Sequence, residues 1–137
     1  DIRIAAEEAK FGFPETDVGL TITTAGTKLL AQIVGLGKAK ELVFTGDFID
    51  AHEALAVGLA NKVVAAERLL DESMAMARRI GEKSPLALKL SRIAIDQGLH
   101  SSFEQTLEME AGHLLTCAGA QNQQKFVERK LEQMKGK

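Results

Sequence analysis

Apolar residues recur every three or four positions through most of the chain, which is the spacing of amphipathic helices. One apolar stripe predicts a helix over 27–34. The next predicts a helix that ends at Gly46, where glycine can take the left-handed capping conformation. Asp50 and Glu53 stand three residues apart, as a capping carboxylate and its partner do, and they predict a short helix closed by Gly58.

The second half of the chain is predicted to be almost entirely helical. Ser84 and Pro85 supply a cap and a first-turn proline for a helix that runs to Gly98. Ser101 and Glu104 have the spacing of a capping box, which predicts the start of the next helix. That helix is expected to bury six apolar side chains: Phe103, Leu107, Ala111, Leu114, Leu115 and Ala118.

The first part of the chain alternates apolar and polar residues over short runs. The runs 1–5, 11–13 and 59–64 each predict a strand. Pro14 ends the second of them at a turn, because proline has no amide hydrogen to donate. Since the chain opens directly in a strand-like run, we expect it to be the C-terminal piece of a longer chain. The expected fold class is α/β, with a small α/β portion followed by a helical one.

Composition and charge narrow the classes of function. The 137 residues are 45% apolar and carry a formal net charge of −2, which argues against a nucleic-acid-binding protein. No apolar run approaches the roughly 18 residues that a membrane span needs. A single cysteine, Cys117, excludes an intramolecular disulfide framework. These features predict a soluble intracellular protein that acts on a small molecule or a protein partner.

Several pairs of reactive side chains have weak spacing signals. Glu110 and His113 form one Glu-x-x-His pair, whereas a di-iron site needs two such pairs, and the histidines lack zinc-ligand spacing, so no metal is expected. Cys117 lies one turn from His113 among leucines, which favours an inert core residue over a thiolate nucleophile. The last helix is expected over about 121–134. The basic residues in and after it form either a solvated face or a cationic rim for a phosphorylated ligand. They are Lys125, Arg129, Lys130, Lys135 and Lys137.

Glu15 is the strongest candidate for a catalytic residue. It follows Pro14 at the end of a strand, close to Phe11 and Phe13 and ahead of an uncharged loop. A carboxylate among apolar side chains with few donors is suited to moving protons near neutral pH. The alternative, an exposed glutamate in a turn, has about equal weight from composition alone.

The order of short motifs resembles one known family. The run 1–15, ending in Phe-Gly-Phe-Pro-Glu, and the Val-Gly-Leu at 18–20 closely resemble the middle of the enoyl-CoA hydratase/isomerase (crotonase) superfamily. Blocks at 36–42, 45–54 and 58–64 look like the family's next motifs, in order. The resemblance extends over about residues 1–98 and is weaker beyond them.

The resemblance implies a fold and an activity. It implies the C-terminal part of a crotonase-like spiral core over 1–64, followed by a mainly helical oligomerisation region over 65–137. Family members bind acyl-CoA thioesters and hold the thioester oxygen with two backbone amides as an enolate forms. Glu15 matches the second of the two acids that the hydratases use. The complete protein is therefore expected to be a cytoplasmic enzyme that hydrates an enoyl-CoA or shifts its double bond.

Under this resemblance Pro14, Leu20 and Thr23 are expected to bind the substrate. CoA belongs to the substrate, so no separate cofactor is implied. The expected assembly is a homotrimer or a dimer of trimers, with no nucleic-acid or membrane partner. Because the family's N-terminal half, with its oxyanion hole and first acid, is absent, the chain alone is expected to be inactive.

Two departures from the family pattern leave the reaction open. The family's glycine-rich loop is replaced here by residues 22–27, and Thr23 stands where a glycine often offers its amide to the catalytic water. A β-branched residue there penalises the positive φ that glycine allows. The last helix has Gln-Gln-Lys-Phe at 123–126 in place of the usual pattern. A thioester hydrolase, or a non-catalytic acyl-CoA-binding or oligomerisation module, is therefore the alternative.

Overall fold

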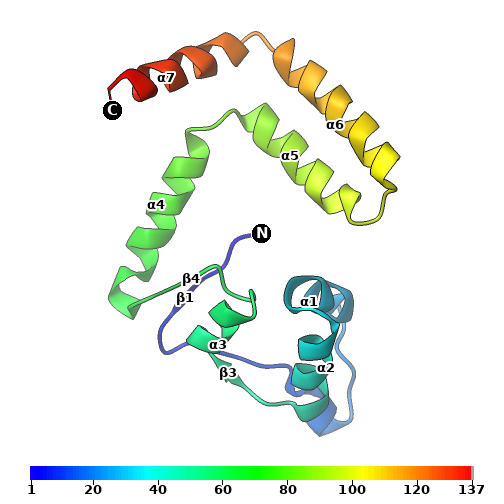
Figure 1. The fold of residues 1–137 in the computed structure, drawn as a ribbon. Coiled ribbons are helices and arrows are strands. Elements are labelled where there is room, and N and C mark those ends of the chain that lie inside the picture. Colours follow the sequence, from blue (N-terminus) through cyan, green and yellow to red (C-terminus); the bar gives the residue numbers. More distant parts are fainter. Residues whose placement is uncertain (137) are drawn as a thin grey trace. The chain divides into compact units, whose positions relative to one another are not determined.

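The computed structural model describes residues 1–136 (Figure 1). The chain forms two compact units, of which the first spans Asp1–Ala75 and the second begins at Met76. The division falls inside helix α4 (Leu69–Gly81). The sequence predicts a different division, at residue 64, between a core region and an oligomerisation region. That division concerns function and stays a prediction.

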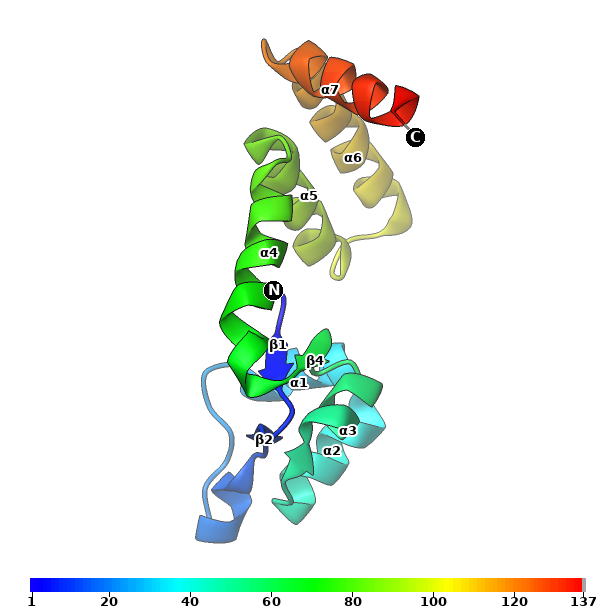
Figure 2. The same ribbon diagram turned by 90° about the vertical axis from the view of Figure 1, so that its left-hand side faces the viewer.

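Four short strands of the first unit pair as two small sheets. β1 (Ile4–Ala6) lies parallel to β4 (Lys62–Val64), and β2 (Lys10–Phe11) lies antiparallel to β3 (Ile49–Asp50). Figure 2 shows β1 beside β4. Because two-stranded pairs of this length are not stable in water alone, they depend on the helices packed against them. The β2–β3 pair fixes the start of the segment that carries Glu15.

Three helices of the first unit begin or end at residues that the sequence predicts, but the third ends at Ala56, two residues before the predicted Gly58. α1 (Gly26–Val34) ends at a glycine of positive φ, and α2 (Leu36–Thr45) ends at Gly46, whose φ of 68° is left-handed. α3 (Ala51–Ala56) begins with the predicted cap, because the Asp50 carboxylate accepts the Glu53 amide at 2.8 Å. The capping predictions at Gly46 and Asp50 are therefore confirmed.

The buried hydrophobic core of the described residues lies in the first unit. Leu42 is its largest fully buried side chain, and Ala51 and Ala54 are wholly buried on α3. Small alanines on facing surfaces allow the helices and strands to approach closely. The core cluster consists of Ala5, Leu30, Ala39, Leu42, Ile49, Ala51, Ala54, Leu59 and Ala60.

The second unit contains α5 (Pro85–Gly98), α6 (Phe103–Ala118) and α7 (Gln123–Lys135). α5 begins as predicted, with the Ser84 hydroxyl accepting the Ala87 amide at 3.3 Å. The prediction that Ser101 and Glu104 form a capping box is wrong, because the capping box lies one residue later. It is formed by Ser102 and Gln105, each of which accepts the other's amide, at 3.2 and 3.0 Å. Ser101 instead donates its hydroxyl to the Gln97 carbonyl.

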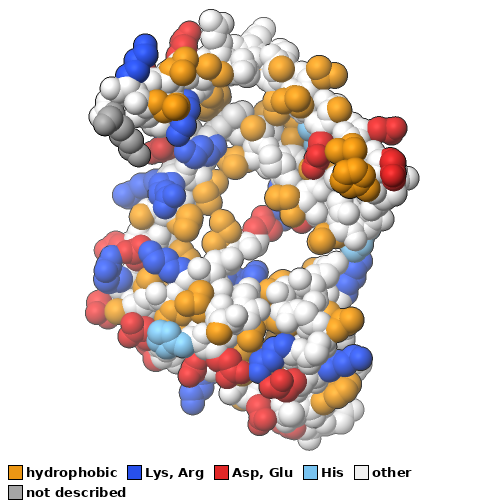
Figure 3. Space-filling model, in the orientation of Figure 1, with side chains coloured by type: hydrophobic (Ala, Val, Ile, Leu, Met, Phe, Trp, Pro, Cys, Tyr) orange, Lys and Arg blue, Asp and Glu red, His pale blue; other side chains and the backbone are white. Residues whose placement is uncertain are grey.

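The predicted burial of the apolar stripe of α6 is also wrong. Phe103 is 73% exposed, Leu114 69% and Leu115 73%, and no residue of α6 is fully buried. α6 packs against α5, and its least exposed residues lie on a neighbouring face: Thr106, Met109, His113 and Cys117. Figure 3 shows hydrophobic side chains on the surface along this part of the chain. Helical periodicity identifies an apolar stripe but does not say what covers it.

The contribution of Glu72 to stability is expected to disappear in acid. Lys62 and Arg68 both donate hydrogen bonds to its carboxylate, and the Lys62 bond comes first in holding the pKa of Glu72 below its usual 4.5. Because the folded-state pKa lies below the unfolded one, the contribution is present above about pH 4.5 and is lost as the pH falls through the folded-state pKa. The measurement is the free energy of unfolding in urea from about pH 7 to about pH 3.

The expected result is that Glu72→Gln flattens the acid dependence of this free energy. Glu67→Gln is the matched control, because Glu67 is exposed in the adjoining short helix η2 (Ala66–Arg68). Equal acid sensitivity in Glu72→Gln and in the parent protein would contradict the assignment.

Candidate active site

Glu15 lies in a short 3-10 helix, η1 (Pro14–Val18), directly after β2 and two intervening residues. Pro14 occupies the first position, where its fixed φ suits a helix and its missing amide costs nothing. η1 ends at Gly19, whose φ of 74° is left-handed. The Leu20 amide then bonds the Glu15 carbonyl at 2.9 Å, so the turn closes back on the glutamate.

The Glu15 carboxylate is partly buried and incompletely bonded. Its Oε2 atom is inaccessible to solvent and has no hydrogen-bond partner among the described residues. A buried acceptor left without a donor costs about 1–3 kcal/mol, and more when it is charged. Phe11 and Phe13, which precede it, pack against the core. The oxygen is therefore available to a hydrogen-bond donor from outside the described residues.

The structure brings some of the predicted substrate-binding residues together. Pro14, Glu15 and Leu20 belong to one turn, and Leu20 is 64% exposed beside Val18, which is 72% exposed. Thr23 lies in the loop that follows, where its hydroxyl is 3.3 Å from that of Thr24. No hydrogen bond among residues 1–136 joins Thr23 to η1.

The loop before α1 has a strained, left-handed backbone, but not at Thr23, where the sequence predicts it. The positive φ values belong to Thr24 and Ala25, both at 59°, and not to Thr23. A residue other than glycine in this conformation costs on the order of 1–3 kcal/mol. The expectation that Thr23 bears the penalty is therefore wrong. The reason is that the turn before α1, closed by the Gly26 amide on the Thr23 carbonyl, places its left-handed residues between those two.

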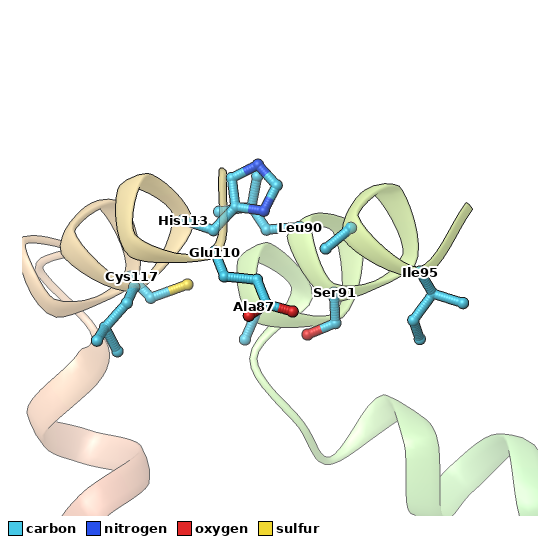
Figure 4. A pocket seen from close by; sticks show the side chains of 9 residues that line it. Ala87, Leu90, Ser91, Ile95, Glu110, His113 and Cys117 are labelled. Carbon is cyan, nitrogen blue, oxygen red and sulfur yellow. The ribbon is translucent and has the colours of Figure 1, made fainter. Parts of the chain in front are cut away.

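A groove between α5 and α6 was not predicted as a site. It has a volume of about 530 Å³ and contains polar groups on an otherwise apolar lining (Figure 4). His113 contributes a buried Nδ1 atom without a partner, and Glu110, Ser91 and Cys117 also line it. The Glu110–His113 spacing was the available sequence signal. No cluster of three or more potential metal-ligating side chains occurs among residues 1–136.

The basic residues of α7 include one that forms an ion pair and others that are exposed to solvent. Arg129 forms an ion pair with the Glu82 carboxylate at 3.1 Å and also donates to the Glu82 carbonyl. Lys125 and Lys130 are exposed, and Lys137 lies outside the described residues. The cationic rim for a phosphorylated ligand stays a prediction.

Comparison with known proteins gives a consistent result. The sequence model of the family described as enoyl-CoA hydratase/isomerase matches residues 1–137. A crotonyl-CoA hydratase from Syntrophomonas wolfei is 42% identical over 135 residues, which are 98% of this chain and 52% of that protein. A short-chain-enoyl-CoA hydratase from Clostridium acetobutylicum is 39% identical over all of this chain and 54% of its own length.

Solved structures agree with the sequence relatives. The crystal structure of an enoyl-CoA hydratase from Bacillus anthracis matches with a TM-score of 0.92 and 32% identity, over 97% of this chain and 52% of that one. The mixed α/β, helix-rich fold is thus that of the crotonase-like proteins, as expected.

The chain spans about half the length of these relatives. These shares give the matched length alone, so the expected correspondence to the C-terminal half of the family stays a prediction. The full-length match to the family model and the identity of about 40% to named hydratases establish the family itself. This chain belongs to the enoyl-CoA hydratase/isomerase family.

Proposed function

We propose that the complete protein acts on an enoyl-CoA thioester, either adding water to its double bond or shifting that bond, with Glu15 as the acid/base. The observation that carries this proposal is the solvent-inaccessible, unpartnered Oε2 of Glu15. The names of the relatives, a crotonyl-CoA hydratase and a short-chain-enoyl-CoA hydratase, support the class of substrate.

Hydration delivers a proton to the carbon next to the thioester carbonyl, whereas shifting a 3-enoyl double bond removes a proton from that carbon and adds one two carbons further along the acyl chain. A carboxyl group moves such a proton efficiently when it lies within hydrogen-bond reach and away from bulk water. Among residues 1–136 no donor competes for Glu15 Oε2, so this oxygen is free to exchange a proton with the substrate. The amides that hold the thioester oxygen, and the first acid of a two-acid mechanism, are proposed to come from residues beyond this chain.

The substrate is proposed to contact the turn that carries Glu15. The exposed side chain of Leu20 would line the acyl pocket, together with Pro14 and Thr23. An apolar side chain that is 64% exposed beside a partly buried acid is suited to contact a short acyl chain.

The oligomeric state and the cellular compartment of the complete protein are also part of the proposed function. The exposed apolar stripe of α6 supports a homotrimer or a dimer of trimers, in which a second copy would cover this face. We propose that CoA enters as part of the substrate and that no separate cofactor is used. We also propose that the enzyme acts in the cytoplasm. Within the described residues, no helix has both the length and the apolar character needed to cross a membrane.

Product analysis of the complete protein tests the reaction. The protein is incubated with 2-enoyl-CoA and 3-enoyl-CoA substrates, and the products are separated and weighed by mass spectrometry. Hydration adds the mass of one water to an intact thioester, whereas isomerisation leaves the mass unchanged and moves the double bond. Either product supports the proposal.

Two other outcomes would overturn it. Release of free CoA thiol, with a fatty acid as the second product, would assign a thioester hydrolase. Binding of the acyl-CoA without turnover, measured by calorimetry, would assign a non-catalytic binding module.

A further inference from the structure

The 3-10 helix that carries Glu15 is attached to α2 through its own next residue. The Thr16 hydroxyl donates a hydrogen bond to the Val43 carbonyl at 2.8 Å. Among residues 1–136, this is the one hydrogen bond that a side chain of η1 makes to another element. A five-residue 3-10 helix has few internal hydrogen bonds, so a hydrogen bond to another element contributes strongly to fixing its orientation.

The acceptor of this bond is a carbonyl group at the solvent-exposed end of α2. The Val43 carbonyl lies in the last turn of α2, where carbonyl groups have no amide four residues ahead within the helix. The Asp47 amide, which would be its next donor, bonds the Thr45 hydroxyl instead. The Thr16 hydroxyl therefore satisfies the end of α2 while it holds η1.

A second contact brings η1 to the same place. The Asp17 carboxylate lies so close to Gly46 that a Cβ atom on Gly46 would be 2.7 Å from both of its oxygens. Gly46 has positive φ and no side chain, so the end of α2 leaves room for η1. The two residues that follow Glu15 are thus both seated on the end of α2.

We propose that Thr16 is a positioning residue, whose hydroxyl clamps η1 to the end of α2 and so fixes the Glu15 carboxylate against the substrate. This inference rests on the proposed function of Glu15. Thr16 itself does not touch the reacting atoms, and its side chain is exposed at the clamp. A displacement of about 1 Å in a catalytic group can lower the rate by up to about 10²-fold, so the loss of one clamp is expected to be visible in kcat.

The test begins with three single variants of the complete protein and then repeats Thr16→Val in a Glu15→Gln background. Thr16→Val keeps the β-branched shape and removes the donor, while Thr16→Ser keeps the donor. Ser73→Ala is the control, because the Ser73 hydroxyl, in the same unit, also donates to a helix carbonyl, that of Leu69, but within α4 itself. The measured quantities are kcat, KM and the melting temperature.

The expected result is a fall in kcat of about 10-fold in Thr16→Val with KM changed less than about 2-fold. Thr16→Ser restores kcat, and Ser73→Ala retains it. In a Glu15→Gln background, Thr16→Val has no further effect on kcat, because the group it positions no longer transfers a proton.

Failures of the clamp and of the proposed function are distinguishable. If Glu15→Gln abolishes turnover while Thr16→Val retains the parent kcat, the clamp is wrong and the role of Glu15 stands. If Thr16→Ser fails to restore kcat, or Ser73→Ala lowers it equally, the effect is a general loss of structure and the clamp is also wrong. If Glu15→Gln itself keeps full turnover, the proposed function fails and the clamp fails with it.

Discussion

Glu15→Gln is expected to lower kcat of the complete protein by about 10²- to 10⁴-fold, the range over which a positioned acid/base contributes to a proton transfer. Glutamine keeps the size and polarity of the side chain but cannot exchange a proton with carbon. The change is also expected to leave folding intact, because the Oε2 atom it replaces makes no hydrogen bond among the described residues. The measurement is kcat and KM with an enoyl-CoA substrate, together with a melting curve.

Glu8→Gln is the matched control for this experiment. Glu8 is exposed in the turn between β1 and β2, in the same unit as Glu15. It is expected to keep kcat within about 2-fold of the parent, as surface changes distant from a site do. Survival of turnover and of its pH dependence in Glu15→Gln would remove Glu15 from the mechanism.

Gly26→Ala is expected to destabilise the complete protein by about 1–3 kcal/mol, the usual cost of overpacking. A Cβ atom at Gly26, the first residue of α1, would lie 2.5 Å from Cγ2 of Ile22. Ile22 is buried, with 9% of its surface exposed, so it cannot move aside into solvent. The preceding left-handed residues Thr24 and Ala25 also restrict how far the backbone can shift.

Gly37→Ala provides the control for Gly26→Ala. Gly37 is in the first turn of α2 with no atom within 4 Å of the position of its Cβ. Alanine there is expected to leave the free energy of unfolding unchanged or to raise it by up to about 1 kcal/mol. Denaturant unfolding of both variants measures the difference, and equal effects at the two glycines would contradict the packing argument.

Helix ends were predictable where one residue type dominates the local chemistry. Gly46, Asp50 and the Ser84–Pro85 pair each offer a cap that few other residues supply, and the structure uses all of them. At the start of α6 two serines compete, and the sequence does not decide between them. The side-chain amide of Gln105 completes a capping box with Ser102, which leaves Ser101 to bond back to α5.

The candidate site was predictable at Glu15 and less so around it. A Pro-Glu pair after two phenylalanines indicates a glutamate at a strand end, and its place in η1 follows from the proline. The strained positions at 24 and 25 depend on how the loop reaches α1, which no local pattern states. The Thr16 bond likewise joins segments 27 residues apart, so only the folded chain brings donor and acceptor together.

The core cluster described above lies wholly within the first unit. In terms of local stability, the two units therefore differ. Amide hydrogens of residues within that core, such as Leu42, are expected to exchange with solvent only on extensive unfolding. Those of α6, whose apolar stripe is open, are expected to exchange through small local openings. Any surface that covers α6 would therefore slow exchange along that helix, even if its backbone conformation stayed the same.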